Sequence, residues 1–288
     1  MHGDPATYVP LWHPSCLSVS VTPATVQPPS IHASEFYKRV IQAFQAKDID
    51  FLVGGAYAFV HYTGIGRDTK DLDLFIRRSD WDKVTAVLAE EGITTELTFP
   101  HWLGKAFGGR QREFFVDVIF SGGNGVAEVD DEWFAHAQPD ESLGYPVRLM
   151  PVEEMLWSKA FLMERERFDG ADVLHLVRAR QNDLDWPRLL SRFGEHWRVL
   201  LAHLVLYEYV YPNDPAPQGV IDQLLDRAKN ERNEDTGIRL CRGPLLSREQ
   251  YLVDTERWNY FDARQVPLGT MTPEEIANWT KAIEKKPA

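Results

Sequence analysis

The sequence predicts an α+β fold, with a mixed β-sheet flanked by helices in the N-terminal part and a mainly α-helical C-terminal domain. Short apolar segments that suit strands alternate with helical periodicities up to about residue 150. Beyond that point the helical periodicities continue almost alone. Pro151 suits the first turn of a helix, so we place a domain boundary there. The predicted division is an irregular tail over residues 1–31, one domain over 32–150 and a helical domain over 151–288.

The first half of the chain supplies the predicted strands. Residues 1–31 hold six prolines and no helical period, which predicts the irregular tail. Ser34 can cap a first helix, whose apolar residues recur at helical spacing as far as Phe44. A second helix capped by Ser79 separates two of the strands. The segments expected to form strands are 49–53, 72–76, 94–99, 114–120 and 146–150.

The second half of the chain is predicted to be helical. Lys159 lies on the helix that begins after Pro151. Further helices are expected over 172–180, 185–194, 195–211 and 219–230, and from Thr272 onward. Thr272 is followed three residues later by Glu275, which is a capping-box pattern. Residues 231–271 are aromatic and charged without a clear period, so no element is predicted there.

Composition limits the class of protein. A chain of 288 residues can bury a sizeable core. Its formal charge of −12 argues against extended DNA binding, because phosphate neutralisation supplies most of that affinity. No apolar run approaches 18 residues, so no membrane span is expected. The two distant cysteines and the lack of a secretory pattern favour a reducing cytoplasm.

Two glycines, Gly54 and Gly55, lie between the first predicted strand and an alanine-rich segment compatible with a helix. A helix that begins there directs its free backbone N–H groups and the positive end of its dipole toward an anion. Glycine also lets a phosphate approach the backbone closely, because it has no Cβ. The pattern therefore predicts a phosphate-binding turn.

An acidic pair interrupts the next predicted strand. Asp71 and Asp73 are two residues apart, so their carboxylates share one face of an extended strand, roughly 6.5–7 Å apart. Two like charges held that close repel each other, and a divalent cation relieves the repulsion. A pair of Mg²⁺ ions bridged by carboxylates serves in-line attack at phosphorus. The spacing therefore predicts a magnesium site, most simply one that holds two ions.

This arrangement resembles the opening signature of the DNA polymerase β-type nucleotidyltransferase superfamily. The shared pattern is the Gly54–Gly55 turn, a helix, and then Asp71 and Asp73 followed by apolar residues. With Arg67 ahead of the acidic pair, residues 35–180 are most similar to the bacterial AbiEii-like branch of abortive-infection and toxin nucleotidyltransferases. The resemblance implies that residues 32–150 form a nucleotidyltransferase catalytic domain.

Three more residues match places that the resemblance implies. A third carboxylate is needed from a neighbouring strand, and Asp117 supplies one in the middle of six apolar residues. Burying such a carboxylate without a partner is costly. Lys159 matches the family's helical lysine, and Asp172 matches the acidic position of its later charged motif. Asp71, Asp73 and Asp117 are then the expected metal ligands and catalytic residues.

The resemblance also implies a reaction. An NTP would bind with its phosphates over the glycine turn, and an acceptor hydroxyl would attack the α-phosphorus and expel pyrophosphate. Asp117 would help to deprotonate the acceptor, and Lys159 would contact the phosphates or the leaving group. Asp172 would orient Lys159 or the acceptor, and Arg67 is a phosphate contact in this interpretation.

The acceptor stays open at this point. RNA, a protein or a small molecule would each provide a hydroxyl group. An AbiEii-type toxin would have an antitoxin as partner, whereas an antibiotic-modifying nucleotidyltransferase would act on a small molecule. The sequence does not discriminate between these roles.

Other interpretations of the same residues also stay open. Asp68–Lys70 matches the sparse D-x-K element of some metal-dependent nucleases, and a non-catalytic nucleotide-binding module is a further alternative. Lys159 could simply reach water from an amphipathic helix, and Asp172 could be a helix cap. Three cations near Asp117 could meet a triphosphate or only solvate a loop; these are Lys105, Arg110 and Arg112.

Overall fold

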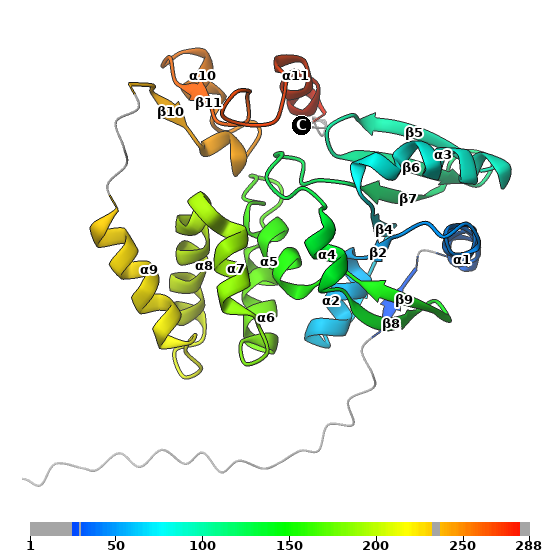
Figure 1. Ribbon diagram of the computed structural model, residues 1–288, viewed down its shortest axis with the longest axis horizontal. Coiled ribbons are helices and arrows are strands. Elements are labelled where there is room, and N and C mark those ends of the chain that lie inside the picture. The colour runs from blue at the N-terminus through cyan, green and yellow to red at the C-terminus, as the bar shows by residue number, and fades with distance from the viewer. Residues whose placement is uncertain (1–24, 29, 232–236, 283–288) are drawn as a thin grey trace, which may run out of the picture.

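The computed structural model describes residues 25–28, 30–231 and 237–282. Within them, seven strands form one mixed sheet in the order β5-β6-β7-β4-β2-β9-β8, with helices on both sides (Figure 1). These strands are β2 (Leu52–Val53), β4 (Leu72–Phe75), β5 (Thr94–Phe99), β6 (Leu103–Gly108), β7 (Phe114–Ile119), β8 (Gln138–Ser142) and β9 (Tyr145–Leu149). Two small pairs join β1 (Val26–Gln27) to β3 (Arg67–Asp68) and β10 (Leu240–Cys241) to β11 (Phe261–Asp262). The predicted α+β class is confirmed.

Helices dominate the second half of the described chain, as predicted. The helices before the boundary are α1 (Ile31–Ala46), α2 (Gly55–Thr63), α3 (Trp81–Glu90) and α4 (Asp131–Ala135). Those after it are α5 (Val152–Ala160), α6 (Gly170–Arg180), α7 (Trp186–Phe193), α8 (Trp197–Val210), α9 (Gln218–Asn230), α10 (Leu252–Glu256) and α11 (Pro273–Lys281). None of the helices in the described ranges is both long and apolar enough to cross a membrane.

Helix α5 starts directly after Pro151, where we placed the domain boundary. One cluster of buried apolar residues nevertheless continues from the sheet into the C-terminal helices. The division into two domains therefore stays a prediction, and most of the predicted tail lies outside the described residues.

Strands β4 and β7 are parallel neighbours, and each presents one apolar face. Four of their side chains are fully buried on the face covered by α1 and α3: Leu72, Leu74, Val116 and Val118. Because side chains alternate along a strand, Asp73 and Asp117 project from the opposite face. This alternation places the acidic residues away from the packed core and toward α5.

The start of three helices differs from the prediction. Helix α3 follows a short 3₁₀ turn, Arg78–Asp80, and its N-cap residue is Asp80, so the prediction of Ser79 as the cap was wrong. Helix α1 is capped by Ser30, whose hydroxyl accepts a hydrogen bond from the backbone N–H of Ala33 at 3.0 Å, so the prediction of Ser34 as the cap was wrong. Helix α6 is capped by Asp169, and Asp172 lies in its first turn, so the reading of Asp172 as a cap was also wrong. Strand β8 was missed because its polar residues form an exposed sheet edge.

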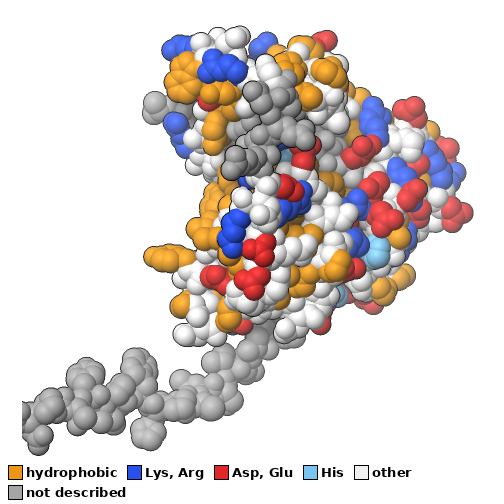
Figure 2. All heavy atoms as spheres, turned by 60° about the vertical axis from the view of Figure 1, so that its left-hand side comes forward, with side chains coloured by type: hydrophobic (Ala, Val, Ile, Leu, Met, Phe, Trp, Pro, Cys, Tyr) orange, Lys and Arg blue, Asp and Glu red, His pale blue; other side chains and the backbone are white. Residues whose placement is uncertain are grey.

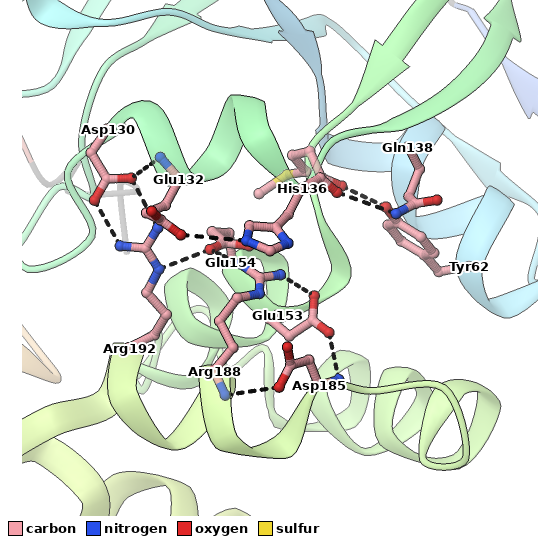
Figure 3. A network of polar contacts seen from close by, with 11 residues as sticks. Tyr62, Asp130, Glu132, His136, Gln138, Glu153, Glu154, Asp185, Arg188 and Arg192 are labelled. Carbon is pink, nitrogen blue, oxygen red and sulfur yellow. Dashed lines mark hydrogen bonds and ion pairs between the residues drawn. The ribbon is translucent and has the colours of Figure 1, made fainter.

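Helix α5 is fixed to α7 by ion pairs that Figure 3 shows. Glu154 is fully buried and accepts hydrogen bonds from Arg188 and, at 2.9 Å, from Arg192. The neighbouring Glu153 pairs with the other side of Arg188. These contacts hold in place the helix that carries Lys159.

Residues 237–282, called here the C-terminal segment, lie across one end of the molecule and return to the sheet. Figure 1 shows α10, α11 and the β10–β11 pair there, and α11 contacts β5. The backbone N–H of Met163 donates to the carbonyl of Leu246 at 3.1 Å. The side-chain amide of Asn124 donates to the carbonyl of Leu245 at 2.8 Å. The elements of this segment before α11 are short, which is why no sequence period predicted them. Helix α11 begins after Thr272 with the predicted capping box.

The surface in Figure 2 shows the side that carries α8 and α9. Acidic, basic and apolar side chains are mixed on the described part of this face. The exposed apolar side chains of α8 are Val205, Leu206, Tyr209 and Val210. We assign no partner to them.

Candidate active site

A cavity of about 340 Å³ lies between the main sheet, α5 and the C-terminal segment. Its polar end is lined by Gly55, Asp71, Asp73, Asp117, Lys159 and Arg167. The aspartates come from β4, the residue before it and β7, whereas Lys159 comes from α5 and Arg167 from the turn before α6. Regions far apart in the sequence therefore meet at one end of the cavity.

Two of the predicted carboxylates lie on one face of the sheet, and the third lines the same cavity. Asp73 and Asp117 are direct partners on the parallel strands β4 and β7, and neighbouring strands lie about 4.8 Å apart. Lys105 is the partner of Asp117 on β6, and its ammonium group donates a hydrogen bond to that carboxylate. Asp71 precedes β4 and lines the same cavity. The structure thus forms a row of Lys105, Asp117 and Asp73, with Asp71 beside it.

The crowding of these carboxylates changes their acidity. Burial, followed by the negative charges of Asp71 and Asp117, raises the pKa of Asp73 to about 7. Burial also raises the pKa of Asp117 to about 6, although the ammonium of Lys105 lowers it. The cluster therefore holds more negative charge than its surroundings compensate, and an added cation would stabilise it.

The glycine turn lies directly against Asp73. Gly55 is the first residue of α2 and has a φ of +53°, and the backbone N–H of Gly54 donates to the carbonyl of Asp73 at 3.0 Å. A Cβ built on Gly55 would lie only 1.7 Å from a carboxylate oxygen of Asp73. Because Gly55 has no side chain, the carboxylate of Asp73 fits against the first residue of α2.

Lys159 is held by two carboxylates. Its ammonium group donates to Asp169 at 2.7 Å and to Asp172 at 2.8 Å. Arg167 forms two parallel hydrogen bonds with Asp169, at 2.9 and 3.0 Å, and Arg67 pairs with Asp172. Lys159 does not reach into bulk water, because this network fixes it at the cavity wall.

Asp169 is the acidic residue that the sequence analysis missed. Burial alone would raise the pKa of Asp169, but hydrogen bonds from Arg167 and the charge of Lys159 lower it to about 2. Arg167 was likewise not predicted, although both residues belong to the charged run before α6. That run was the available signal, and its spacing did not show which carboxylate faces Lys159.

The predicted nucleotide-binding residues differ in their position. Gly55 and Lys159 line the cavity, whereas Gly54, Arg67 and Asp172 are not among its lining residues. Asp172 contacts Lys159, which is one of the two roles predicted for it. Direct contacts of Gly54 and Arg67 with a nucleotide stay predictions. Of the cations near Asp117, Lys105 binds it directly, while Arg112 pairs with Glu96 at the surface.

A family model described as "Uncharacterised nucleotidyltransferase" matches residues 31–207. The chain belongs to this family. The matched region of the nucleotidyltransferase contains the glycine turn, the three aspartates, Lys159 and the charged cluster around it. The C-terminal segment lies outside the match. The AbiEii-like branch, by contrast, is a finer assignment than this match supports.

Solved structures with distant similarity include the antibiotic-resistance factor ANT(2'')-Ia in solution, at 16% identity and a TM-score of 0.39, covering 59% of this chain and 95% of that one. A lincomycin-bound lincosamide antibiotic adenylyltransferase, LnuA, has 14% identity and a TM-score of 0.35, covering 50% and 94%. An antigenic nucleotidyltransferase-like protein from Paracoccidioides brasiliensis has 15% identity and a TM-score of 0.38, covering 67% and 98%. No curated protein matches the chain.

The donor chemistry of this nucleotidyltransferase suits a magnesium ion. Mg²⁺ prefers carboxylate oxygens, and Asp71, Asp73 and Asp117 offer them at one end of the cavity. Among the residues the structure describes, no three potential ligands converge at metal-binding distances as they stand. The ammonium of Lys105 instead neutralises Asp117. Metal binding would therefore require Asp117 to exchange this ion pair for the metal.

We expect Asp169→Asn to reduce nucleotidyl transfer roughly ten- to hundredfold, the loss typical of a hydrogen bond to a charged group. The Asp169 side chain makes no capping hydrogen bond, so α6 should keep its start while Lys159 and Arg167 lose a charged partner. Initial transfer rates at saturating Mg²⁺ test this. Asp183→Asn, an exposed residue with a single weak ion pair, is the control and should be unchanged. Equal rates for the two variants would contradict the role of Asp169.

Proposed function

We propose that the chain transfers the NMP group of an NTP to a hydroxyl acceptor and releases pyrophosphate. The observation that carries the proposal is the row of Asp73 and Asp117, with Asp71 beside it, at the amino end of α2 and across the cavity from Lys159. The family membership agrees with this reaction class. Metal dependence and the residue roles below are parts of the proposal.

Each side chain has a task that follows from its position. Backbone N–H groups in the first turn of α2, which have no partner within the helix, would bind phosphate oxygens. Lys159, held by Asp169 and Asp172, would contact the phosphates that leave as pyrophosphate. Arg67 acts through Asp172 in this arrangement. Asp117, which lies beside Asp73 on the neighbouring strand, would accept the proton of the acceptor hydroxyl.

The bonds change as follows. The acceptor oxygen forms a bond to the α-phosphorus, the bond from the α-phosphorus to the oxygen that bridges to the β-phosphorus breaks, and the acceptor proton moves to Asp117. Mg²⁺ held by Asp71, Asp73 and Asp117, most simply as two ions, would supply neutralisation of the charge that develops on the phosphates. The protein's own contribution is to position the two reactants in line.

Incubation with α-³²P-labelled NTPs, Mg²⁺ and a cell lysate tests the proposal. Wild-type protein should transfer label to an acceptor and release unlabelled pyrophosphate, whereas Asp71→Ala/Asp73→Ala should not. Each NTP is tested separately, which also identifies the base. The proposal fails if no fraction of the lysate becomes labelled, or if the double variant transfers label as fast as the wild type.

The same experiment separates the biological roles. Label in RNA or protein would support the AbiEii-type toxin role, with an antitoxin as the expected partner, whereas label in a small molecule would support an antibiotic-modifying or related enzyme. Nicking of a plasmid without pyrophosphate release would support the nuclease alternative. Asp68 and Lys70, on which that alternative depends, are exposed and do not line the cavity.

A further inference from the structure

The end of the cavity beyond the carboxylates is apolar and rich in rings. It is lined by Trp102, Ile119, Phe161, Leu162, Pro244, Leu245, Leu246 and Trp279. These residues come from the main sheet, from the chain directly after α5, and from the C-terminal segment. An apolar pocket continuous with a polar reaction centre is typical of a small-molecule site, and 340 Å³ is within the usual size range.

Two indole rings define this end. Trp102 and Trp279 pack edge to face, with ring centroids 5.0 Å apart and an angle of 69° between the rings. Trp279 also lies against the turn at Gly123, where a Cβ would approach the indole to 2.7 Å. Both indoles line the cavity, so they present apolar ring surface to a ligand.

The charged side chains at this end already neutralise each other. Glu164 accepts hydrogen bonds from the Ser247 hydroxyl at 2.6 Å and from the backbone N–H of Arg248 at 3.1 Å. The guanidinium of Arg248 lies 3.4 Å from the Glu164 carboxylate and 4.2 Å from the ring centroid of Trp279. A polycationic acceptor would find no free carboxylate among the described residues of this end, and burying its charges unpaired would be costly.

The apolar end also differs in origin from the reaction centre. The aspartates, the glycine turn and Lys159 lie within residues 31–207, which the family model matches, whereas Pro244 and Trp279 lie outside it. All members of a nucleotidyltransferase family use an NTP, whereas their acceptors differ. The cavity wall that the C-terminal segment adds is therefore suited to bind the acceptor.

We infer that the acceptor is an uncharged small molecule that carries a planar aromatic ring, bound against Trp102 and Trp279 with its hydroxyl directed toward Asp117. This inference rests on the proposed function and specifies its acceptor. The hydroxyl oxygen forms the new bond to the α-phosphorus, its proton moves to Asp117 and pyrophosphate leaves. The ring gains by contact with the two indoles and by apolar burial.

Binding of 4-methylumbelliferyl β-D-glucoside, an uncharged planar ring with free hydroxyl groups, tests the inference without catalysis. Its dissociation constant is measured by calorimetry at saturating Mg²⁺ for the wild type, Trp279→Leu and Trp279→Phe. Trp279→Leu should weaken binding roughly tenfold, whereas Trp279→Phe keeps a ring and should stay within about threefold. Trp258→Ala changes an exposed tryptophan that does not line the cavity and is the matched control.

Three results would overturn the inference: no binding of the glucoside to wild type at millimolar concentration, equal binding by wild type and Trp279→Leu, or tighter binding of the polycation kanamycin. Circular dichroism checks that each variant is folded. If Trp279→Leu does not fold, the comparison of Trp279→Phe with the wild type still tests the inference. Transfer from α-³²P-labelled NTPs separates the two proposals. If the glucoside binds but neither it nor any lysate fraction becomes labelled, the reaction is rejected. Label in kanamycin or in macromolecules alone rejects the acceptor class.

Discussion

Asp73→Asn should abolish nucleotidyl transfer, with a loss of roughly a thousandfold or more, and should at the same time stabilise the metal-free protein. The activity falls because the central carboxylate of the acidic row disappears, and with it the charge that would hold Mg²⁺. The stability rises because the variant removes repulsion among three neighbouring carboxylates. Loss of activity together with a gain in stability is what distinguishes a functional carboxylate from a structural one.

The stability gained by Asp73→Asn should depend on pH in a known direction. The ordinary pKa of an aspartate is 3.8, and that of Asp73 in the metal-free fold is about 7. Between these values the folded protein holds a proton that the unfolded chain releases, so the free energy of unfolding decreases as pH rises from about 4 to about 7. Asp73→Asn should remove this contribution, and the difference between the two proteins should be largest above pH 7.

Urea unfolding at several pH values, with and without Mg²⁺, measures the effect. Mg²⁺ should stabilise the wild type and leave Asp73→Asn nearly unchanged. Asp68→Asn is the matched control, because Asp68 is exposed and does not line the cavity, and it should alter neither transfer nor stability. A destabilised Asp73→Asn protein that still transfers label would show that this carboxylate serves the fold and not the reaction.

Glu154→Ala should lower the free energy of unfolding by about 3–5 kcal/mol, the usual cost of removing one partner from a buried ion pair. Glu154 is fully buried and does not line the cavity. It lies between the guanidinium groups of Arg188 and Arg192 (Figure 3). Its removal leaves two nearly buried cations with a single carboxylate partner each, Glu153 and Asp130. Burial raises the pKa of Glu154, although both arginines lower it.

Urea unfolding followed by circular dichroism measures this loss. The control is Glu132→Ala, because Glu132 is exposed and its ion-pair partner is His136, and it should change stability by no more than about 0.5 kcal/mol. Nucleotidyl transfer at low temperature should persist in Glu154→Ala, since Glu154 supports α5 from behind and does not line the cavity. Unfolding midpoints that coincide for the two variants would contradict a structural role for this ion pair.

The sequence determined the parts of this protein that depend on local pattern. Two residues of spacing were enough to predict that Asp71 and Asp73 lie close together, and both line the cavity. An isolated aspartate in an apolar strand indicated Asp117 as the third carboxylate that the family resemblance requires. The glycine turn before a helix is equally local, because it reflects backbone conformation at two positions. The switch from strands to helices after Pro151 also followed from periodicity alone.

Only the tertiary structure decided which side chains meet. The ammonium of Lys105 binds Asp117 because β6 and β7 pair in one register, and no spacing in the chain specifies that register. Asp169 faces Lys159 because α6 starts two residues earlier than its periodicity suggested. Trp279 lies beside Trp102 because the C-terminal segment returns across the sheet. Contacts between distant segments depend on how whole elements pack, whereas the local pattern fixes only the face that each element presents.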